Sequence, residues 1–440
     1  MTISRQLQYA LIKNVAAPLL VKTDAWKSAR SFRAKKDKPN PPFGPRLESY
    51  IKLKELMLEH YFTGRYADGA VPVAWITSGS PVELLRPFGF HIVYPENHAA
   101  LCAVRRRAKD LCVHAENEGF CRDLCSYART DFGSVMSGQT PVGRVPKPDL
   151  LVTCTNICQT ALAWYKVLAR KFNVPLYVFD TPFIYGEGEE HDVDYIVAQF
   201  HELIEMCEKV TGRKLDQKQL TYHTQLGCEC SKAWGKVLDL CRNRPAPMTT
   251  FDAFIYIGPI VAMRGLPECL SFYKFLHDEL QDRVSRGIGA IQNERYRLLW
   301  DNLPIWFAIR DLSTAFAQGG FNFVCSTYTN AWAETAHHFD PNDVYRSSAK
   351  LYSRIILNRD LRNKADLILK LCRDFQCDGA VLHSDRSCKP YSVGQYNLAD
   401  ILNREHGIKT MILEADHGDP RSYSPEQGEL RVKAFMETFQ

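Results

Sequence analysis

The pattern of apolar and polar residues between positions 148 and 182 predicts a strand, a helix and a second strand. An apolar run at 150–152 is followed by a polar loop. Residues 159–172 then place apolar side chains three and four positions apart, which is typical of an amphipathic helix. A second apolar run, 176–179, follows a short breaker of asparagine, valine and proline. The segment therefore indicates a strand–helix–strand unit of an α/β protein.

The same order of elements recurs near the other end of the chain, between positions 377 and 420. An apolar run at 380–382 precedes a polar loop, residues 393–404 can form a helix, and a further apolar run covers 409–413. We interpret this recurrence as a duplicated α/β module, although any two strand–helix–strand units share these features. The duplication is favoured by a cysteine that follows the first strand in both segments.

Both of these cysteine-bearing loops are candidates for a functional site. In an open α/β sheet, ligands bind beside the carboxyl ends of the strands, where such loops lie. The loop of the first segment carries Cys154 and Cys158, and the loop of the second carries Cys388.

The remaining pattern divides the chain into four regions. Residues 1–70 are expected to be mainly helical, 71–185 to form the first α/β module, 186–285 to form a helical connection, and 286–440 to form the second α/β module. A chain of 440 residues is too long for one compact core, which agrees with this division. The expected fold is α/β, with two tandem Rossmann-like or flavodoxin-like modules of mostly parallel strands.

Composition and charge indicate an ordinary globular protein. Hydrophobic residues make up 45% of the chain and charged residues 24%, with a formal net charge of +5. This charge is too small to indicate binding to nucleic acid or to a membrane surface. The start of the chain does not have the pattern of a signal peptide, and no run of about 18 apolar residues could span a membrane. We therefore expect a cytoplasmic protein.

Fifteen cysteines are many for a chain in a reducing compartment, where disulfides are disfavoured. Buried core positions, metal ligands and reactive groups are the remaining roles. The Cys228 and Cys230 pair is weak evidence for a metal, because side chains two positions apart diverge on a helix. Several cysteines lie in apolar contexts and are expected in the core, namely Cys207, Cys241, Cys269, Cys325 and Cys372.

Three other cysteines stand in polar or glycine-containing sequence, namely Cys125, Cys158 and Cys388. Thiolates are the soft ligands that iron–sulfur clusters require. Two thiolates from one module and one from the other would place a cluster in the cleft between the modules. Zinc is the nearest competitor, but the chain lacks the compact Cys-x2-Cys pairs that zinc sites commonly show.

Five stretches of the chain resemble the 2-hydroxyacyl-CoA dehydratase / benzoyl-CoA reductase family. The similarity extends from about residue 70 to the end and includes several long motifs in the family's order. Within the family, the segments SCKPYS and RLLWDNLPIW are most similar to the B-type subunit of the ATP-dependent (class I) benzoyl-CoA reductases. The stretches are SPVELLRPFGFHIVYPEN, DLCSYARTDFG, PDLLVTCTNICQTALAWY, GAIQNERYRLLWDNLPIW and DGAVLHSDRSCKPYSVGQY.

The resemblance implies that this chain holds one [4Fe-4S] cluster through three cysteines, one from each of three segments. These are Cys125 in DLCSYAR, Cys158 in CTNIC and Cys388 in RSCKPYS. Cys121 and Cys154 precede the first two by four residues each, so either could replace its neighbour or supply a fourth ligand.

The resemblance also implies partners and a reaction. Family members pair with a homologous cluster-bearing subunit, and an ATPase activator with its own bridging [4Fe-4S] cluster docks on the pair. The activator binds ATP and Mg²⁺, and this chain has no Gly-x4-Gly-Lys-Ser/Thr loop of its own. Ferredoxin supplies the electrons, and benzoyl-CoA is reduced to a cyclic diene.

Three alternatives to the reductase stay open. One is a subunit of a radical (R)-2-hydroxyacyl-CoA dehydratase, which eliminates water instead of reducing a ring. A second is a non-catalytic subunit that only relays electrons or acts as a scaffold. The third is a structural protein stabilised by zinc.

Five further residues are candidates for contacts with the substrate. Glu294 and Arg297 could face the thioester or the CoA phosphates, although a surface salt-bridge set fits them equally well. His383 and Lys389 flank the third cysteine and could donate a proton or bind substrate, although a structural role is the default. Trp300 could wall an aromatic ring, although buried tryptophans usually belong to the core.

Overall fold

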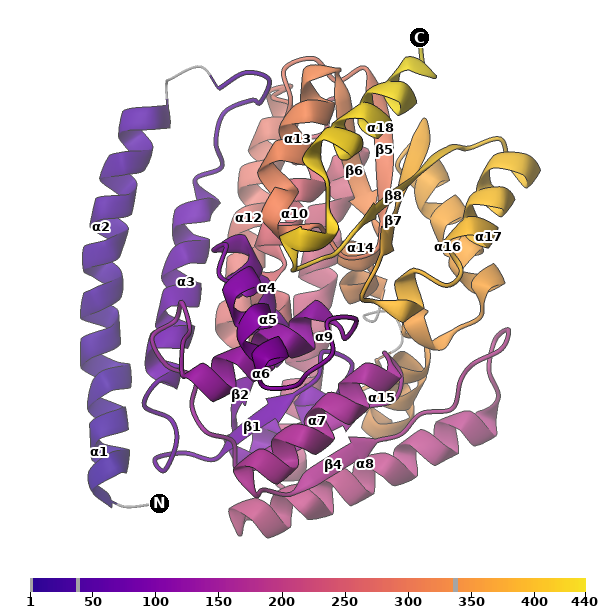
Figure 1. The fold of residues 1–440 in the computed structure, drawn as a ribbon. Coiled ribbons are helices and arrows are strands. Elements are labelled where there is room, and N and C mark those ends of the chain that lie inside the picture. Colours follow the sequence, from indigo (N-terminus) through magenta and orange to yellow (C-terminus); the bar gives the residue numbers. More distant parts are fainter. Residues whose placement is uncertain (1–2, 37–39, 335–338) are drawn as a thin grey trace.

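The computed structural model describes residues 3–36, 40–334 and 339–440, which contain two four-stranded sheets (Figure 1). All pairings within the sheets are parallel, and the strand orders are β2-β1-β3-β4 and β6-β5-β7-β8. This architecture confirms the expected α/β fold. The strands are β1 (Val73–Ile76), β2 (His91–Val93), β3 (Leu150–Cys154), β4 (Leu176–Phe179), β5 (Tyr296–Asp301), β6 (Phe321–Ser326), β7 (Gly379–Asp385) and β8 (Lys409–Ala415).

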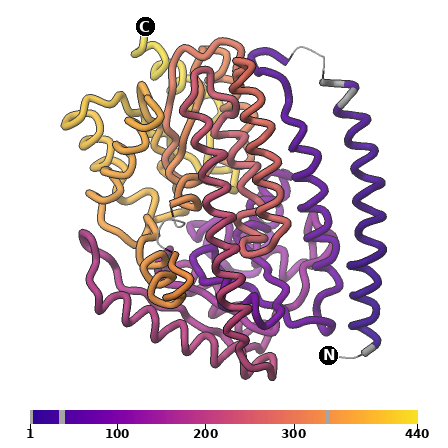
Figure 2. The backbone as a smooth tube through the Cα atoms, turned by 180° about the vertical axis from the view of Figure 1, so that it is seen from behind, coloured from indigo at the N-terminus to yellow at the C-terminus, as the bar shows by residue number. Residues whose placement is uncertain are grey.

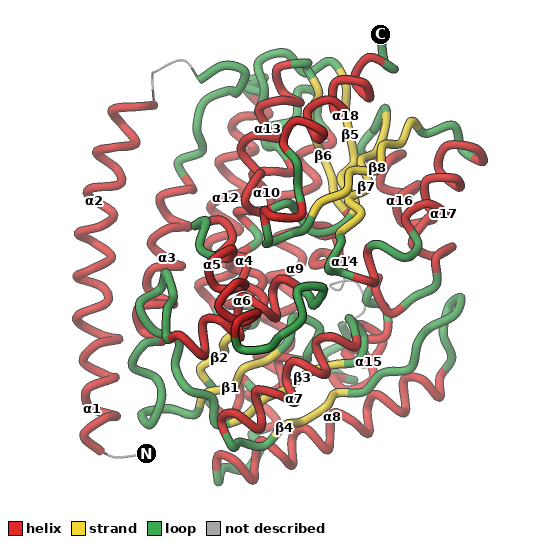
Figure 3. Tube along the Cα trace, viewed as in Figure 1, coloured by secondary structure: helices red, strands yellow, loops and turns green. Residues whose placement is uncertain are grey.

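Helices form most of the rest of the described chain and surround the two sheets (Figure 3). The first sheet lies within residues 71–185 and the second within 286–440, while the boundaries of the four regions stay a prediction. The α-helices are α1 (Ile3–Leu11), α2 (Ala17–Lys36), α3 (Ser49–Gly64), α4 (Pro95–Val104), α5 (Ala108–Asn117), α6 (Ser126–Ser137), α7 (Gln159–Phe172), α8 (Glu190–Thr211), α9 (Gln217–Asp239), α10 (Thr250–Tyr256), α11 (Gly258–Met263), α12 (Pro267–Ser285), α13 (Ile309–Gln318), α14 (Thr327–Glu334), α15 (Val344–Ser353), α16 (Leu361–Asp374), α17 (Gln395–Asp400) and α18 (Pro425–Glu437).

The first strand–helix–strand unit forms as its sequence predicts, and local caps explain its limits. Helix α7 starts after Cys158, whose Sγ accepts a hydrogen bond from the N–H of Ala161 at 3.3 Å. It ends at Asn173, which adopts a left-handed conformation with φ of 52°. Asparagine tolerates this conformation better than most residues, which fixes the helix end just before β4.

Two local predictions need correction. Cys154 is the last residue of β3 and lies in the strand, not in the loop. Between β1 and β2, the chain forms a pair of 3₁₀ turns, Val82–Leu84 and Arg86–Phe88, and Pro87 has no N–H to continue a helix. The helix expected at 393–404 is α17 followed by a π-helical turn, Ile401–Glu405.

Each sheet has side chains on both of its faces in the protein core. Alternate residues of β3 and β7, such as Val152 and Leu382, belong to one cluster of buried apolar residues. Their neighbours, such as Leu151 and Val381, belong to a second cluster on the opposite faces. Both clusters include residues from both sheets, so the two halves of the chain share their cores.

Long helices complete the framework around the sheets. Helices α9 and α12 pack against each other and run along the back of the molecule (Figure 2). Helices α1 and α2 form an arm at one side that packs on α3 (Figure 1). Among the described residues, none of the helices combines the length and the apolar composition that a membrane span needs.

Candidate functional site

Three cysteines predicted as ligands occupy equivalent local positions. Cys125, Cys158 and Cys388 each stand immediately before a helical turn, at the start of α6, of α7 and of a 3₁₀ turn at Lys389–Tyr391. Cys158 follows β3 and Cys388 follows β7, so both lie at the carboxyl ends of parallel strands. This is the edge of an α/β sheet where ligands bind.

The three thiols lie within electrostatic range of one another, as the pKa values of two of them indicate. Burial raises the pKa of Cys388 well above its ordinary value, and Asp385, Cys125 and Cys158 raise it further. Burial and then the Cys125 thiol raise the pKa of Cys158 to about 12. Neighbouring thiols with raised pKa values are costly to ionise together unless a cation compensates their charge.

The two alternative cysteines differ from this set in their surroundings. Cys121 is exposed, and its sulfur accepts a hydrogen bond from the N–H of Asp123 at 3.5 Å. Cys154 is fully buried at the end of β3, where its sulfur lies 3.0 Å from the hydroxyl of Thr77. Neither of them stands at a helix start, unlike the other three.

A buried histidine that was not foreseen lies beside Cys125. The Nε2 atom of His417 is 3.8 Å from the Cys125 sulfur and 2.9 Å from the hydroxyl of Ser126. On the other side of the ring, Nδ1 donates to Asp385 at 2.6 Å. Within the described ranges, Asp385, Asp416 and His417 are the only His, Cys, Asp or Glu side chains that form a group of three with ligand atoms within 4.8 Å of one another.

Charge around His417 favours its protonated form. Burial alone would lower its pKa, but the carboxylates of Asp385 and Asp416 raise it well above the ordinary value. No sequence motif indicates this arrangement, because Asp385 ends β7 while His417 follows β8. The only sign of this group in the sequence is the acidic residue Asp416, which follows the apolar run at 409–413.

A buried arginine holds the Cys125 loop against the second half of the chain. Arg129 is 1% exposed and donates to the carbonyl of Leu124 at 2.8 Å. It also forms ion pairs with Asp419 at 2.8 Å and with Glu116 at 2.7 Å. Cys125 is therefore held against the loop that carries His417.

Glu96 is a second residue that the sequence analysis missed. It lies in the first turn of α4, just after β2, and accepts hydrogen bonds from the N–H of Ser78 at 2.7 Å and from its hydroxyl at 3.1 Å. Burial raises its pKa to about 7, and its charge contributes to the raised pKa of Cys158. The signal available was a glutamate at a helix start after an apolar strand.

Aromatic side chains enclose the region of the thiols. Tyr127, which follows Cys125 by two residues, packs edge-on against His417 with ring centres 4.2 Å apart. Its hydroxyl accepts a hydrogen bond from the indole N–H of Trp306. Tyr391 is buried, and the Cys388 thiol contributes to its raised pKa. These rings form an apolar surface beside Cys125 and Cys388, which are themselves partly exposed.

Glu294 and Arg297 lie at the other end of the second sheet. Arg297 is fully buried near the amino end of β5, whereas Cys388 follows the carboxyl end of the neighbouring β7. Its guanidinium bonds Glu294 at 2.7 Å and three backbone carbonyl groups. Glu294 also accepts from the N–H of Ala246 and from Asn322. Both groups are engaged inside the fold, and a contact of this pair with the thioester or the CoA phosphates stays a prediction.

The other three candidates have different environments. Trp300 is fully buried and packs against Phe251 and Phe323, so it belongs to the core. His383 is buried on β7 and donates from Nδ1 to a carbonyl at 2.7 Å, while its Nε2 has no partner among the described residues. Lys389 is exposed and bonds a neighbouring carbonyl. A role of His383 or Lys389 toward substrate stays a prediction.

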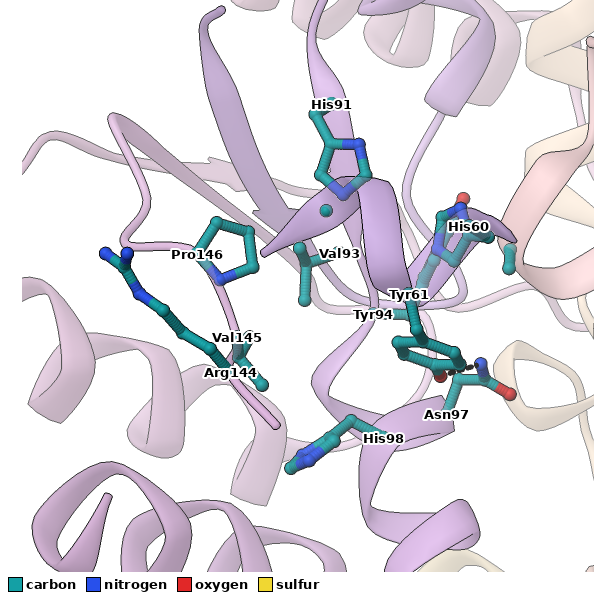
Figure 4. A pocket seen from close by; sticks show the side chains of 12 residues that line it. His60, Tyr61, His91, Val93, Tyr94, Asn97, His98, Arg144, Val145 and Pro146 are labelled. Atoms are coloured by element: carbon teal, nitrogen blue, oxygen red, sulfur yellow. Dashed lines mark hydrogen bonds between the residues drawn. The ribbon is translucent and has the colours of Figure 1, made fainter. Parts of the chain in front are cut away.

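A small cavity with three histidines lies elsewhere, beside β2 (Figure 4). Its volume is about 20 Å³, which is room for a single water molecule. Burial lowers the pKa of His60 and of His98 to about 4, and it also lowers the pKa of His91 well below its ordinary value. These neutral rings fill the space between α3, β2 and α4 and leave no room for a substrate there.

Comparisons with known proteins relate most of the chain to one family. The model of the 2-hydroxyglutaryl-CoA dehydratase D-component family matches residues 77–439. The chain is 32% identical to the (R)-2-hydroxyisocaproyl-CoA dehydratase alpha subunit of Clostridioides difficile over 397 residues, covering 89% of this chain and 96% of the relative. It is 31% identical to the lactoyl-CoA dehydratase alpha subunit of Anaerotignum propionicum, covering 88% and 96%. It is 28% identical to the B-type subunit of the benzoyl-CoA reductase of Thauera aromatica, covering 88% and 94%.

Proposed function

Because this chain belongs to the 2-hydroxyglutaryl-CoA dehydratase D-component family, we propose that it is the iron–sulfur subunit of an ATP-driven benzoyl-CoA reductase. The reaction adds two electrons and two protons to the aromatic ring of benzoyl-CoA and yields a cyclohexadiene-carbonyl-CoA. A homologous subunit completes the catalytic pair. Ferredoxin reduces an ATPase activator, and the activator delivers the electrons to the pair.

The shared local position of three cysteines from distant segments, each before a helical turn, carries this proposal. Cys125 and Cys158 come from the first half of the chain and Cys388 from the second. The pKa values of Cys158 and Cys388 are both raised by neighbouring thiols of this set, which supports one shared site. Three soft donors fit a [4Fe-4S] cluster that keeps one iron free of protein ligands. When bound, such a cluster would supply single electrons of low potential.

The residues around the thiols suit the reduction of an aromatic thioester. The buried rings of Tyr127, Trp306 and Tyr391 limit the access of water from their side, which would reduce the loss of strongly reducing electrons to protons. An aromatic ring packs well against such walls. Burial raises the pKa of Glu96 to about 7, so below that pH the carboxyl group holds a proton that it can give to the ring.

A second candidate is a subunit of an (R)-2-hydroxyacyl-CoA dehydratase. The dehydratase subunits from Clostridioides difficile and Anaerotignum propionicum are slightly more similar to this chain than the reductase subunit is. In that reaction the same Glu96 carboxyl group would move a proton to or from the acyl chain, and water would leave without net reduction.

One experiment separates these functions. The chain is purified without oxygen together with its partner subunits, and iron and sulfide are quantified. The reduced complex then receives benzoyl-CoA or a 2-hydroxyacyl-CoA. Formation of the cyclic diene supports the reductase, and formation of an enoyl-CoA supports the dehydratase. A complex that holds zinc and no iron would contradict both.

Glu96→Gln tests the proton donor. We expect the rate of ring reduction to fall by about 10²–10⁴-fold, because the amide has no acidic proton. The wild-type rate should fall as pH rises through about 7, where Glu96 loses its proton, and this decrease should be absent from the variant. Asp131, whose pKa burial also raises to about 7, provides the control through Asp131→Asn. A pH–rate profile that is unchanged in Glu96→Gln would contradict the assignment.

The same carboxyl group links stability to pH. Its folded-state pKa of about 7 lies above the ordinary value of 4.5, so the folded chain holds the proton more tightly. The stabilisation is complete below pH 4.5 and is lost as pH rises through 7.

A further inference from the structure

Two buried hydrogen-bonding side chains, Asp385 and His417, lead to the sulfur of Cys125. The proposed function gives these two side chains no role. The side chains of Asp385 and His417 are fully buried. Asp385 accepts from Nδ1 of His417 at 2.6 Å, and Nε2 of the same ring lies 3.8 Å from the Cys125 sulfur. A buried pair of this kind is expensive to desolvate, so its position beside a candidate ligand requires a physical explanation.

The ring of His417 is fixed from several sides. Asp385 holds one nitrogen, the hydroxyl of Ser126 contacts the other at 2.9 Å, and Tyr127 packs edge-on against the ring. The backbone carbonyl of His417 also accepts from the N–H of Trp306 at 3.0 Å. Nε2 is therefore directed at the loop of Cys125 with little freedom to turn away.

A metal ion between Asp385, Asp416 and His417 explains these contacts less well. The Nδ1 atom that would bind the ion already bonds Asp385 at 2.6 Å. The Oδ1 atom of Asp416 accepts from the N–H groups of Gly418 at 2.7 Å and of Asp419 at 2.8 Å. The Nδ1 atom of His417 and the Oδ1 atom of Asp416 are thus engaged in hydrogen bonds, whereas the Oδ1 atom of Asp385 has no partner among the described residues.

We propose that His417, oriented by Asp385, is a positioning residue that donates a hydrogen bond to the Cys125 sulfur and raises the reduction potential of the cluster. The inference rests on the proposed function, in which Cys125 is a thiolate ligand. A thiolate has no proton to give, so the ring must donate through an N–H at Nε2, which the sulfur at 3.8 Å shares with the Ser126 hydroxyl at 2.9 Å. Such a donor stabilises the additional negative charge of the reduced cluster.

The first test is the midpoint potential in His417→Leu and His417→Gln, measured by a redox titration followed by electron paramagnetic resonance. The measurement uses the anaerobic complex, and the signal of this chain is the one that Cys158→Ser removes. We expect His417→Leu to lower the equilibrium constant for reduction at least tenfold, or about 59 mV for one electron. The glutamine variant retains an N–H donor and should shift less.

The control is His406→Gln, which changes an exposed histidine of the same half and should leave the potential unchanged. If His417→Leu does not retain iron, His417→Gln provides the test. We expect it to lower the equilibrium constant for reduction at least threefold. Equal potentials in wild type and in the iron-containing variants would overturn the inference.

A second measurement does not depend on the potential. With ¹⁵N-histidine incorporated, the reduced cluster should show a weak nitrogen coupling that His417→Gln abolishes and His406→Gln retains. Absence of this coupling in a cluster-containing wild type overturns the role of His417 alone. Absence of a cluster on this chain overturns the proposed function instead, so the two failures are distinguishable.

Discussion

Cys158→Ser is expected to abolish iron binding by this chain while the fold and the subunit assembly persist. Serine is a good residue at a helix start, so its hydroxyl can replace the sulfur that accepts from Ala161 and keep α7 in place. An alcohol oxygen is a poor ligand for iron in a cluster, so the metal and the activity should be lost together. Iron content, circular dichroism and gel filtration of the variant measure these three properties.

Two neighbouring cysteines serve as controls for the ligand assignment. Cys121→Ser, at an exposed position, should retain full iron content. Cys154→Ser should also retain it, because Cys154 is enclosed at the end of β3 beside Thr77. Our assignment would be wrong if either control lost its iron while Cys158→Ser retained iron.

Arg297→Met should reduce the free energy of unfolding by about 3–5 kcal/mol, because it leaves the buried Glu294 carboxylate without its cation. The variant also leaves three carbonyl groups without a donor. Chemical denaturation of the two proteins measures the difference. Iron content per folded chain should be unchanged, since the pair lies at the amino end of β5.

Arg295→Met is the matched control two residues away. Arg295 is exposed and stacks on Tyr296, so its replacement should cost less than about 1 kcal/mol. If Arg297→Met instead kept normal stability and raised the KM for the CoA ester, the pair would contact substrate after all.

The hydrophobic pattern predicted those parts of the fold that depend on local sequence. Helix α7 and strand β4 were expected at 159–172 and 176–179 and form at those positions. There the spacing of apolar residues and the residues that cap the helix indicate the same boundaries. The pattern was less informative at 80–89, where the chain forms two 3₁₀ turns. It also could not distinguish the last residue of a strand from the first of a loop, as Cys154 shows.

The candidate site could be predicted only where a residue type restricts the chemistry. Cysteines in polar loops and the family motifs pointed to Cys125, Cys158 and Cys388. Glu96 and His417 are ordinary residues in sequence, and they gain significance from neighbours far along the chain, Ser78 and Asp385. Conversely, Glu294 and Arg297 were candidates for substrate binding because they are charged. The sequence does not reveal that the two side chains pair with each other inside the fold.

The apolar clusters that extend through both sheets have a consequence for how the chain can be divided. Both halves contribute residues to each cluster, so severing the connection near residue 286 would expose apolar surface on both pieces. We expect each piece to precipitate when produced separately, and the two to reconstitute a single cooperative particle when produced together. A split of the gene at this point would therefore preserve the protein only if both pieces are produced together and associate as they fold.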